Sequence, residues 1–143
     1  MSKQERAVDV GPTTIGVVGA GSWGTTLAVL LAKKGHTVRL WVLEPEVVEQ
    51  IRSKGQNRTY LPDVDVPESI SATTDLAEVV EGAEVVVSVS PSQHVGEVMA
   101  RAAPHMSDDV QVVSASKGIE HSTLRRMSEV LGSVLTESQM EGF

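Results

Sequence analysis

Short apolar runs alternate with amphipathic segments along the chain. The runs are rich in valine and isoleucine, which predicts buried strands at residues 15–18, 37–42, 69–73, 83–89 and 110–114. Between them, apolar residues recur at helical spacing, which predicts helices at residues 22–34, 45–54, 74–82, 93–103 and 122–135. The last predicted helix carries one apolar face, formed by Leu124, Met127, Val130, Leu131 and Val134. Residues 55–68 are polar and contain two prolines, so we expect an irregular connection there.

The alternation of strands and helices predicts an α/β fold. Nearly continuous apolar strands are typical of a parallel sheet that helices cover on both faces. Right-handed crossovers then give a Rossmann-type, doubly wound parallel sheet in a three-layer α/β/α domain over residues 14–143. Ligands of such folds bind beyond the carboxyl ends of the strands. We therefore expect functional residues just after Val18, Val42, Val89 and Ser114.

The segment after the first predicted strand reads Gly-Ala-Gly-Ser-Trp-Gly, at residues 19–24. In this spacing Gly19 permits a sharp turn, Gly21 lets the backbone approach a pyrophosphate, and Gly24 allows close packing of helix against strand. Backbone amides near Ser22 and Trp23 would then face the anion at the positive end of the helix. The alternative is a glycine turn that serves packing alone, with Trp23 packed over it.

The segment after the second strand bears on which dinucleotide is bound. Glu44 lies 20 residues after the last glycine of the turn, where a Rossmann acid binds the adenosine ribose. A carboxylate there favours NAD, because it repels a 2′-phosphate, and Leu43 supplies no positive charge. Arg39 lies inside the strand, and the next basic residue is Arg52. Glu44 can also be the N-cap of the helix that begins at Pro45, and the two roles are compatible.

Two later segments complete the candidate site. Pro91 ends the clearest strand, Ser92 is a candidate cap for the next helix, and His94 falls in the first turn of that helix. This position makes His94 a candidate acid–base catalyst, but it is more typical of a residue that covers the cofactor or is exposed to solvent. Lys117 lies in a turn of small residues at the carboxyl end of a strand, where an ammonium can bind a phosphate or polarise a carbonyl. An ordinary surface lysine is the alternative.

Composition narrows the classes of function. The net charge is −7 and the basic residues are not clustered, which argues against nucleic-acid binding. There is no cysteine, which excludes disulfides and thiolate chemistry, and the four histidines have no metal-site spacing. No segment is long and apolar enough for a membrane span. Residues 1–13 lack the apolar core of a signal peptide and are expected to form a flexible tail of a cytoplasmic protein.

Several motifs resemble the N-terminal domain of NAD(P)-dependent glycerol-3-phosphate dehydrogenases. They are GAGSWG at residues 19–24, Leu40-Trp41, NRTYLP at 57–62, ATTDLAE at 72–78, Pro91-Ser92-Gln93 and ASKGIE at 115–120. They stand in the order and spacing of the family, over roughly residues 14–135. The resemblance implies an enzyme that transfers hydride between NAD(P)H and dihydroxyacetone phosphate or sn-glycerol 3-phosphate, in the synthesis of glycerophospholipid precursors.

The resemblance also assigns roles to individual residues. Ser22 and Trp23 would line the cofactor phosphates, and Pro91 and His94 would flank the cofactor. Lys117 would contact cofactor and substrate as a catalytic residue.

Other parts that the resemblance implies are not found in the chain. A second catalytic lysine and an all-helical substrate domain would lie beyond Phe143, the last residue. The 143 residues alone are therefore expected to bind dinucleotide weakly and to be inactive, and the full-length protein is expected to be a homodimer.

One position departs from the pattern of the family. Many bacterial members have a basic residue where this chain has Leu43, and the segment from Trp41 to Glu44 is closer to the NAD-using type. NAD is therefore favoured, with NADP left open. Two other functions are also open: a non-catalytic, NAD-sensing module that has no need of Lys117, and another dehydrogenase of the same superfamily that acts on a different hydroxy or keto acid.

Overall fold

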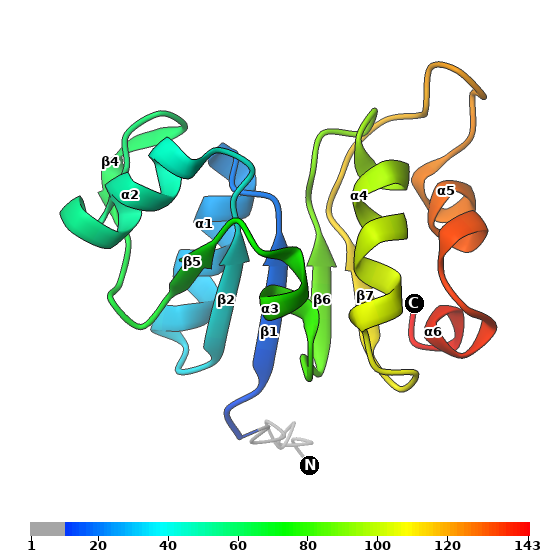
Figure 1. Cartoon of the computed structure of the whole chain (residues 1–143), viewed down its shortest axis with the longest axis horizontal. Coiled ribbons are helices and arrows are strands. Elements are labelled where there is room, and N and C mark those ends of the chain that lie inside the picture. The colour runs from blue at the N-terminus through cyan, green and yellow to red at the C-terminus, as the bar shows by residue number, and fades with distance from the viewer. Residues whose placement is uncertain (1–10) are drawn as a thin grey trace, which may run out of the picture.

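The structure, a computed structural model, describes residues 11–143 and is built around a five-stranded parallel sheet (Figure 1). The strands are β1 (Thr14–Val18), β2 (Thr37–Trp41), β5 (Ser71–Thr73), β6 (Val85–Ser88) and β7 (Gln111–Ser114). Their order across the sheet is β5-β2-β1-β6-β7, with every neighbouring pair parallel. The chain runs outward from β1 to β5, returns to the centre, and runs outward again through β6 to β7. This confirms the predicted doubly wound fold, and the order reverses between β1 and β6.

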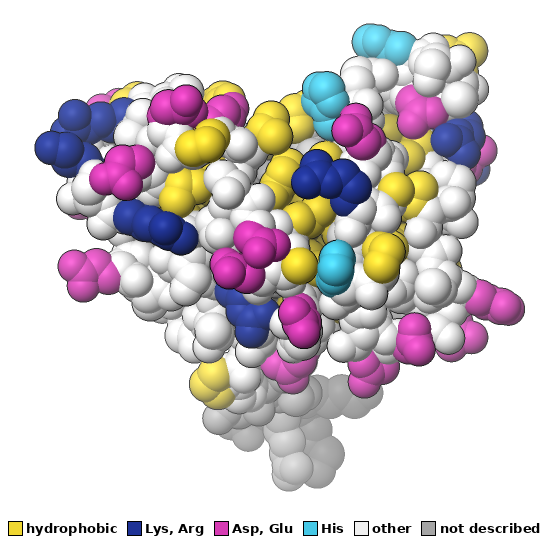
Figure 2. Space-filling view, viewed as in Figure 1, with side chains coloured by type: hydrophobic (Ala, Val, Ile, Leu, Met, Phe, Trp, Pro, Cys, Tyr) yellow, Lys and Arg dark blue, Asp and Glu magenta, His cyan; other side chains and the backbone are white. Residues whose placement is uncertain are grey.

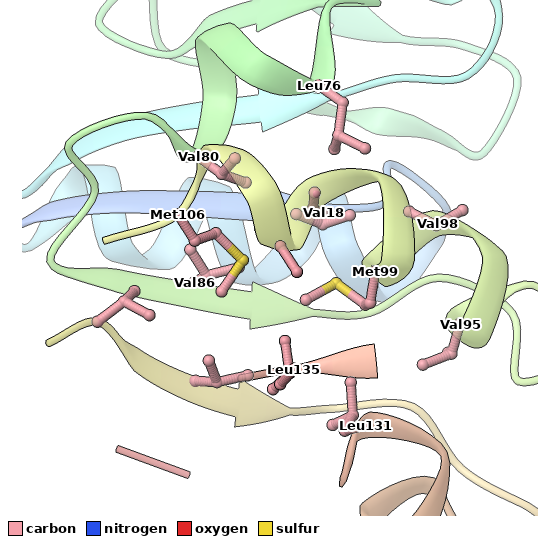
Figure 3. Close-up of a cluster of buried hydrophobic side chains, with 14 of the residues drawn as sticks. Val18, Leu76, Val80, Val86, Val95, Val98, Met99, Met106, Leu131 and Leu135 are labelled. Carbon is pink, nitrogen blue, oxygen red and sulfur yellow. The ribbon is translucent and has the colours of Figure 1, made fainter. Parts of the chain in front are cut away.

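Helices cover both faces of the sheet (Figure 1). On one face lie α1 (Ser22–Lys33) and α2 (Pro45–Lys54), and on the other lie α3 (Leu76–Val80), α4 (Val95–Ala102) and α5 (Met127–Val134). Successive strand residues point to opposite faces, so Val17 and Val18 belong to different apolar clusters. Figure 3 shows the cluster on the second face, which includes Val18 and Val86 from the sheet and Met99 and Leu131 from the helices.

Defined ends keep the helices short. Gly35 (φ 95°) follows α1 and Gly55 (φ 63°) follows α2, both in the left-handed conformation that glycine adopts without strain. Asp75 caps α3, because its carboxylate accepts a hydrogen bond from the Ala77 amide at 3.0 Å. Each helix thus returns the chain to the same edge of the sheet. The carboxyl ends of all five strands meet at the opposite edge.

Residues 55–68 are more ordered than the sequence predicts. Gln56–Asn57 (β3) and Leu61–Asp65 (β4) form a small antiparallel sheet of their own. The expectation of an irregular connection is therefore wrong for this segment. Its main anchor is a single polar side chain, the fully buried amide of Asn57, and a periodic pattern of apolar residues does not reveal such a contact.

The helix predicted at residues 122–135 begins later than expected. α5 starts at Met127, after a loop in which Leu124 has φ 57° and is 71% exposed. The Leu124 amide donates to the Glu120 carbonyl at 2.7 Å, and the Glu120 carboxylate pairs with Arg125 at 3.2 Å, so these residues close a turn. The expectation that Leu124 belongs to the apolar face is therefore wrong, whereas the other members of that face lie in or against the core as predicted.

Two short elements were not predicted, η1 (Ala103–His105) and α6 (Glu137–Glu141). Gln139 joins them. Its side chain is 1% exposed and donates to the carbonyls of Ala103 (3.0 Å) and Met106 (3.4 Å). This polar contact holds α6 on the domain. Thr136 and Gln139 also form a capping box at the start of α6, a local signal that could have predicted the helix.

The tail predicted at residues 1–13 lies mostly outside the described residues. Of its last residues, Thr13 takes part in the fold: its amide donates to Nδ1 of His36 (3.2 Å), and its carbonyl accepts from the Thr37 amide (3.0 Å). From residue 11 onward, no helix is long and apolar enough to cross a membrane.

Candidate functional site

A cleft opens at the carboxyl edge of the sheet, where the strand order reverses. Its volume is about 1040 Å³, and Figure 2 shows the molecule hollowed there, with hydrophobic side chains gathered in the hollow. The walls come from the turns after β1, β2, β6 and β7, together with Tyr60 and one side of α4. This is the place where a doubly wound fold holds its ligand.

Every residue to which the sequence gives a role in the site lines this one cleft. They are Gly19, Gly21, Ser22, Trp23, Gly24, Leu43, Glu44, Pro91, His94 and Lys117. The structure therefore brings together segments that are far apart in the sequence. What each residue does toward a ligand stays a prediction.

The end of the chain lies apart from this cleft. Phe143 is not among the residues that line it, and its amide donates to the Met140 carbonyl at 3.1 Å, just after α6. Among residues 11–143, Lys117 is the only lysine in the cleft wall. The second catalytic lysine that the resemblance places beyond Phe143 therefore has no counterpart in the cleft as described, and it stays a prediction.

The three glycines of the turn after β1 are constrained in different ways. Gly19 has φ 128°, and a Cβ there would lie 2.9 Å from the backbone of Val89 and Ser90. A Cβ on Gly24 would collide with the Gly19 carbonyl oxygen, so the start of α1 packs directly on the turn. Gly21 has an ordinary backbone (φ −68°, ψ −172°), and a Cβ there would have no protein atom within 4 Å. The protein itself thus requires glycine at two of the three positions, and the space beside Gly21 belongs to the cleft.

The first turn of α1 lies in the cleft wall without a side-chain cap. Gly21 is the N-cap and makes no side-chain hydrogen bond to the first amides of the helix, which leaves them for a ligand or water. The helix dipole adds positive potential there. Trp23 is 54% exposed, so its ring is not packed away over the turn. These features suit an anionic ligand.

The turn after β2 presents a carboxylate to the cleft. Leu43 is exposed, and Glu44 occupies the N-cap position of α2 but makes no capping hydrogen bond. Instead, Oε1 of Glu44 accepts a hydrogen bond from the Tyr60 hydroxyl. This hydrogen bond and the negative charge of Glu44 raise the pKa of Tyr60. Glu44 is thus the N-cap residue of α2, as the alternative has it, but its side chain does not cap the helix and its carboxylate points to the Tyr60 side of the cleft.

Two basic residues near Glu44 are committed elsewhere. The Arg39 guanidinium donates to the carbonyls of Glu78 (3.2 Å) and Glu81 (2.5 Å) at the end of α3. Nε of Arg52 donates to the Ala72 carbonyl at 3.0 Å. Neither arginine therefore neutralises the Glu44 carboxylate.

The turn after β6 leads into α4, which begins at Val95, two residues later than predicted. His94 is the N-cap residue, exposed, with its amide bonded to the Pro91 carbonyl at 2.8 Å. The Ser92 hydroxyl accepts from the Gln93 side chain, so the expectation that Ser92 caps the helix is wrong. Pro91 and His94 line the cleft, in the positions expected of residues that flank a ligand.

The turn after β7 places Lys117 at the cleft. Ser116 donates to the Ser90 carbonyl (2.5 Å) and the Ala115 amide donates to the Ser88 carbonyl (2.8 Å), which fastens this turn to the one after β6. Lys117 itself is exposed. Over residues 11–143 the ion pairs join Arg125 to Glu120 and Arg126 to Glu129, so the Lys117 ammonium is available to a bound anion.

Sequence reasoning missed several residues of the site. Tyr60, Arg101 and Trp41 all line the cleft, and the Trp41 indole donates to the Thr74 carbonyl at 3.0 Å. Tyr60 is the only tyrosine of the chain and lies within one of the motifs noted above, which is a signal that could have directed attention to it. Arg101 is an exposed helical residue and gave no signal.

The strand order, the glycine turn at the reversal and the acid after β2 define a Rossmann-type dinucleotide-binding domain. Comparison with known proteins places it more closely. The chain belongs to the family described as NAD-dependent glycerol-3-phosphate dehydrogenase N-terminus, whose sequence pattern matches residues 14–142.

Individual relatives agree with this assignment. The chain is 50% identical over 127 residues to the glycerol-3-phosphate dehydrogenase of Syntrophotalea carbinolica, a match that covers 89% of the chain and 38% of the relative. The solved structure of the Coxiella burnetii glycerol-3-phosphate dehydrogenase superposes with a TM-score of 0.80 at 36% identity, covering 87% of this chain and 38% of that one. A ketopantoate reductase from Ralstonia eutropha is less similar, with a TM-score of 0.68 and 25% identity, covering 85% of this chain and 38% of that one. The chain thus spans little more than a third of the length of these relatives, and it is more similar to the two glycerol-3-phosphate dehydrogenases than to the ketopantoate reductase.

Proposed function

We propose that the cleft binds NAD(H) or NADP(H) and forms the cofactor half of an sn-glycerol-3-phosphate dehydrogenase. The observation that carries this proposal is the glycine turn. The packing of the protein requires glycine at positions 19 and 24, but the space beside Gly21 is open. A pyrophosphate bound against the backbone in that space would explain why position 21 has no side chain. The uncapped start of α1 supplies amides and positive potential for the same anion.

Each candidate residue then has a place along the dinucleotide. Residues 19–24 would hold the pyrophosphate, Leu43 and Glu44 would lie at the adenosine ribose, and Pro91 and His94 would flank the cofactor. Lys117 would contact both cofactor and substrate and polarise the substrate carbonyl. When bound, the nicotinamide supplies or accepts the hydride, and the protein contributes placement and charge.

We favour NAD over NADP for this chain. The Glu44 carboxylate can accept from the ribose hydroxyls and would repel a 2′-phosphate. Arg39 and Arg52, the two nearby cations considered from the sequence, are bonded to backbone carbonyls elsewhere. This charge distribution supports NAD.

Other parts of the proposal concern the protein that carries this domain. The names of the relatives support glycerol 3-phosphate as its substrate. Dihydroxyacetone phosphate is the ketone that oxidation of its secondary alcohol gives, and so is the substrate of the reverse reaction. A homodimer, a cytoplasmic location and a role in making glycerophospholipid precursors stay predictions, as does the absence of nucleic-acid binding.

Titration of the 143-residue chain with NADH tests the cofactor proposal. We expect weak, saturable binding, seen as a change in nicotinamide fluorescence and reversed by excess ADP, which competes for the pyrophosphate and ribose positions. We expect negligible oxidation of NADH when dihydroxyacetone phosphate is added. Absence of saturable binding would contradict the cofactor assignment, and measurable turnover by the chain alone would contradict its expected inactivity.

Lys117 separates an enzyme from a non-catalytic NAD sensor. The test uses a chimera in which residues 14–142 replace the matching segment of the Syntrophotalea carbinolica enzyme, with its activity established first. Lys117→Ala is expected to lower kcat for dihydroxyacetone phosphate roughly 100-fold, because one charge that stabilises the developing alkoxide is lost. The Kd for NADH should rise much less than kcat falls, because the backbone amides of the glycine turn still hold the cofactor, and Lys117→Arg should recover part of the activity. Full activity in Lys117→Ala would favour a surface lysine, whereas a chimera that binds NADH but has no activity would favour the sensor.

A further inference from the structure

The turn that carries Tyr60 is fastened to the glycine turn by a buried side chain. Asn57 is 0% exposed, and its Nδ2 donates to the Ala20 carbonyl and to Oγ1 of Thr25, both at 2.9 Å. Its Oδ1 accepts from the Tyr60 amide at 3.1 Å. The side-chain amide of Asn57 thus uses both of its N–H groups and its carbonyl. This fixes the Tyr60 backbone relative to the turn after β1.

Tyr60 then reaches both ends of the proposed adenosine-diphosphate site. Its carbonyl accepts a hydrogen bond from the Ser22 hydroxyl at 2.5 Å, at the pyrophosphate end. Its hydroxyl donates to Oε1 of Glu44, at the ribose end. Tyr60 and Glu44 line the same cleft, and the tyrosine is 37% exposed. One residue therefore links the group that would hold the phosphates to the acid that would hold the ribose.

We infer that Tyr60 is a positioning residue that sets the preference of the cleft for NADH over NADPH, by holding the Glu44 carboxylate in place. The inference rests on the proposed function. The hydrogen bonds of Asn57 and Ser22 hold the Tyr60 backbone in place, and from that backbone the hydroxyl reaches Glu44 and donates to it. The hydroxyl is protonated at neutral pH, as in any tyrosine, and the hydrogen bond to Glu44 raises its pKa further.

The direction of the effect follows from charge and geometry. A carboxylate has about four acceptor positions, so Glu44 can bind the Tyr60 hydroxyl and still accept from ribose hydroxyls. Held in place, it favours the ribose of NADH and repels the 2′-phosphate of NADPH. Without the hydroxyl, the Glu44 side chain is free to rotate away from either ligand. NADH then loses an oriented acceptor while NADPH escapes a repulsion, and both changes lower the selectivity.

The experiment measures Kd for NADH and for NADPH with the 143-residue chain. Tyr60→Phe is expected to lower the ratio Kd(NADPH)/Kd(NADH) about fivefold to tenfold, with the melting temperature nearly unchanged. Glu44→Gln should also lower the ratio, and the double variant Glu44→Gln/Tyr60→Phe should have the same ratio as Glu44→Gln alone. Thr59→Val is the matched control, because the Thr59 hydroxyl lies in the same turn but bonds to Gln50 at 3.2 Å. It should leave the ratio unchanged.

The outcomes are distinct. An unchanged ratio in Tyr60→Phe overturns the inference, and so does a shift that persists in the Glu44→Gln background. Equal weakening of both cofactors, with a lower melting temperature, assigns Tyr60 a structural role and also overturns it. If the unaltered chain binds neither dinucleotide, the proposed function itself fails.

Discussion

Replacing Gly21 with valine is expected to abolish dinucleotide binding while leaving the fold and its stability nearly unchanged. The backbone of Gly21 (φ −68°, ψ −172°) is available to any residue, and a Cβ there meets no protein atom within 4 Å. The protein therefore has room for a Cβ at this position, and the valine side chain extends from it into the space that we assign to the pyrophosphate. We expect the Kd for NADH to rise about 1000-fold or more, which is roughly 4 kcal/mol. The melting temperature should stay within a few degrees of its original value.

A matched substitution controls for added bulk and β-branching. Gly11 also has no atom within 4 Å of an added Cβ, but it lies outside the cleft. Gly11→Val should change neither the Kd nor the melting temperature, and Gly21→Ala should give an intermediate loss of affinity. If Gly21→Val binds NADH as tightly as the original chain, the turn serves packing alone and the cofactor assignment is wrong.

The fold could be predicted because its strands are buried on both faces. Runs such as residues 83–89 are apolar on both faces, which is typical of a buried strand and not of an amphipathic helix. Their alternation with helical segments predicts a parallel, doubly wound sheet. The elements that were not predicted depend on single polar contacts between side chains and other parts of the chain. Asn57 orders β3 and β4, Gln139 holds α6, and Glu120 with Arg125 closes the loop before α5. None of these contacts produces a periodic pattern.

The residues of the candidate site also fall into two groups, those that the fold predicts and one that it does not. The predicted residues all follow the carboxyl ends of strands, and the topology alone brings those ends together. Tyr60 comes from the connection between α2 and β5, which no rule of the fold places at the cleft. Its position depends on two hydrogen bonds between residues far apart in the sequence, from Asn57 to Ala20 and from Ser22 to Tyr60. Sequence reasoning could identify Glu44 but not the residue that holds it.

Replacing Gly24 with alanine is expected to destabilise the domain, although alanine is the better helix former. Gly24 lies inside α1, where the change to alanine would ordinarily stabilise by about 1 kcal/mol. Here the added Cβ would collide with the Gly19 carbonyl oxygen and lie 2.9 Å from its carbon and 3.0 Å from Cγ1 of Val89. Backbone atoms of the turn cannot move aside without shifting α1 from the sheet. We expect the free energy of unfolding to fall by about 3 kcal/mol.

Urea denaturation of the two alanine variants makes the comparison direct. Gly24→Ala should shift the midpoint strongly, while Gly21→Ala, in the same turn, should hardly move it. NADH affinity should fall in both variants, in Gly24→Ala because the amides of the first turn are displaced and in Gly21→Ala because the ligand is obstructed. The two glycines would then separate the packing role of the turn from its binding role. A Gly24→Ala variant within about 1 kcal/mol of the original stability would mean that α1 can move off the turn at little cost, and that the turn is not the rigid cradle on which the proposed function depends.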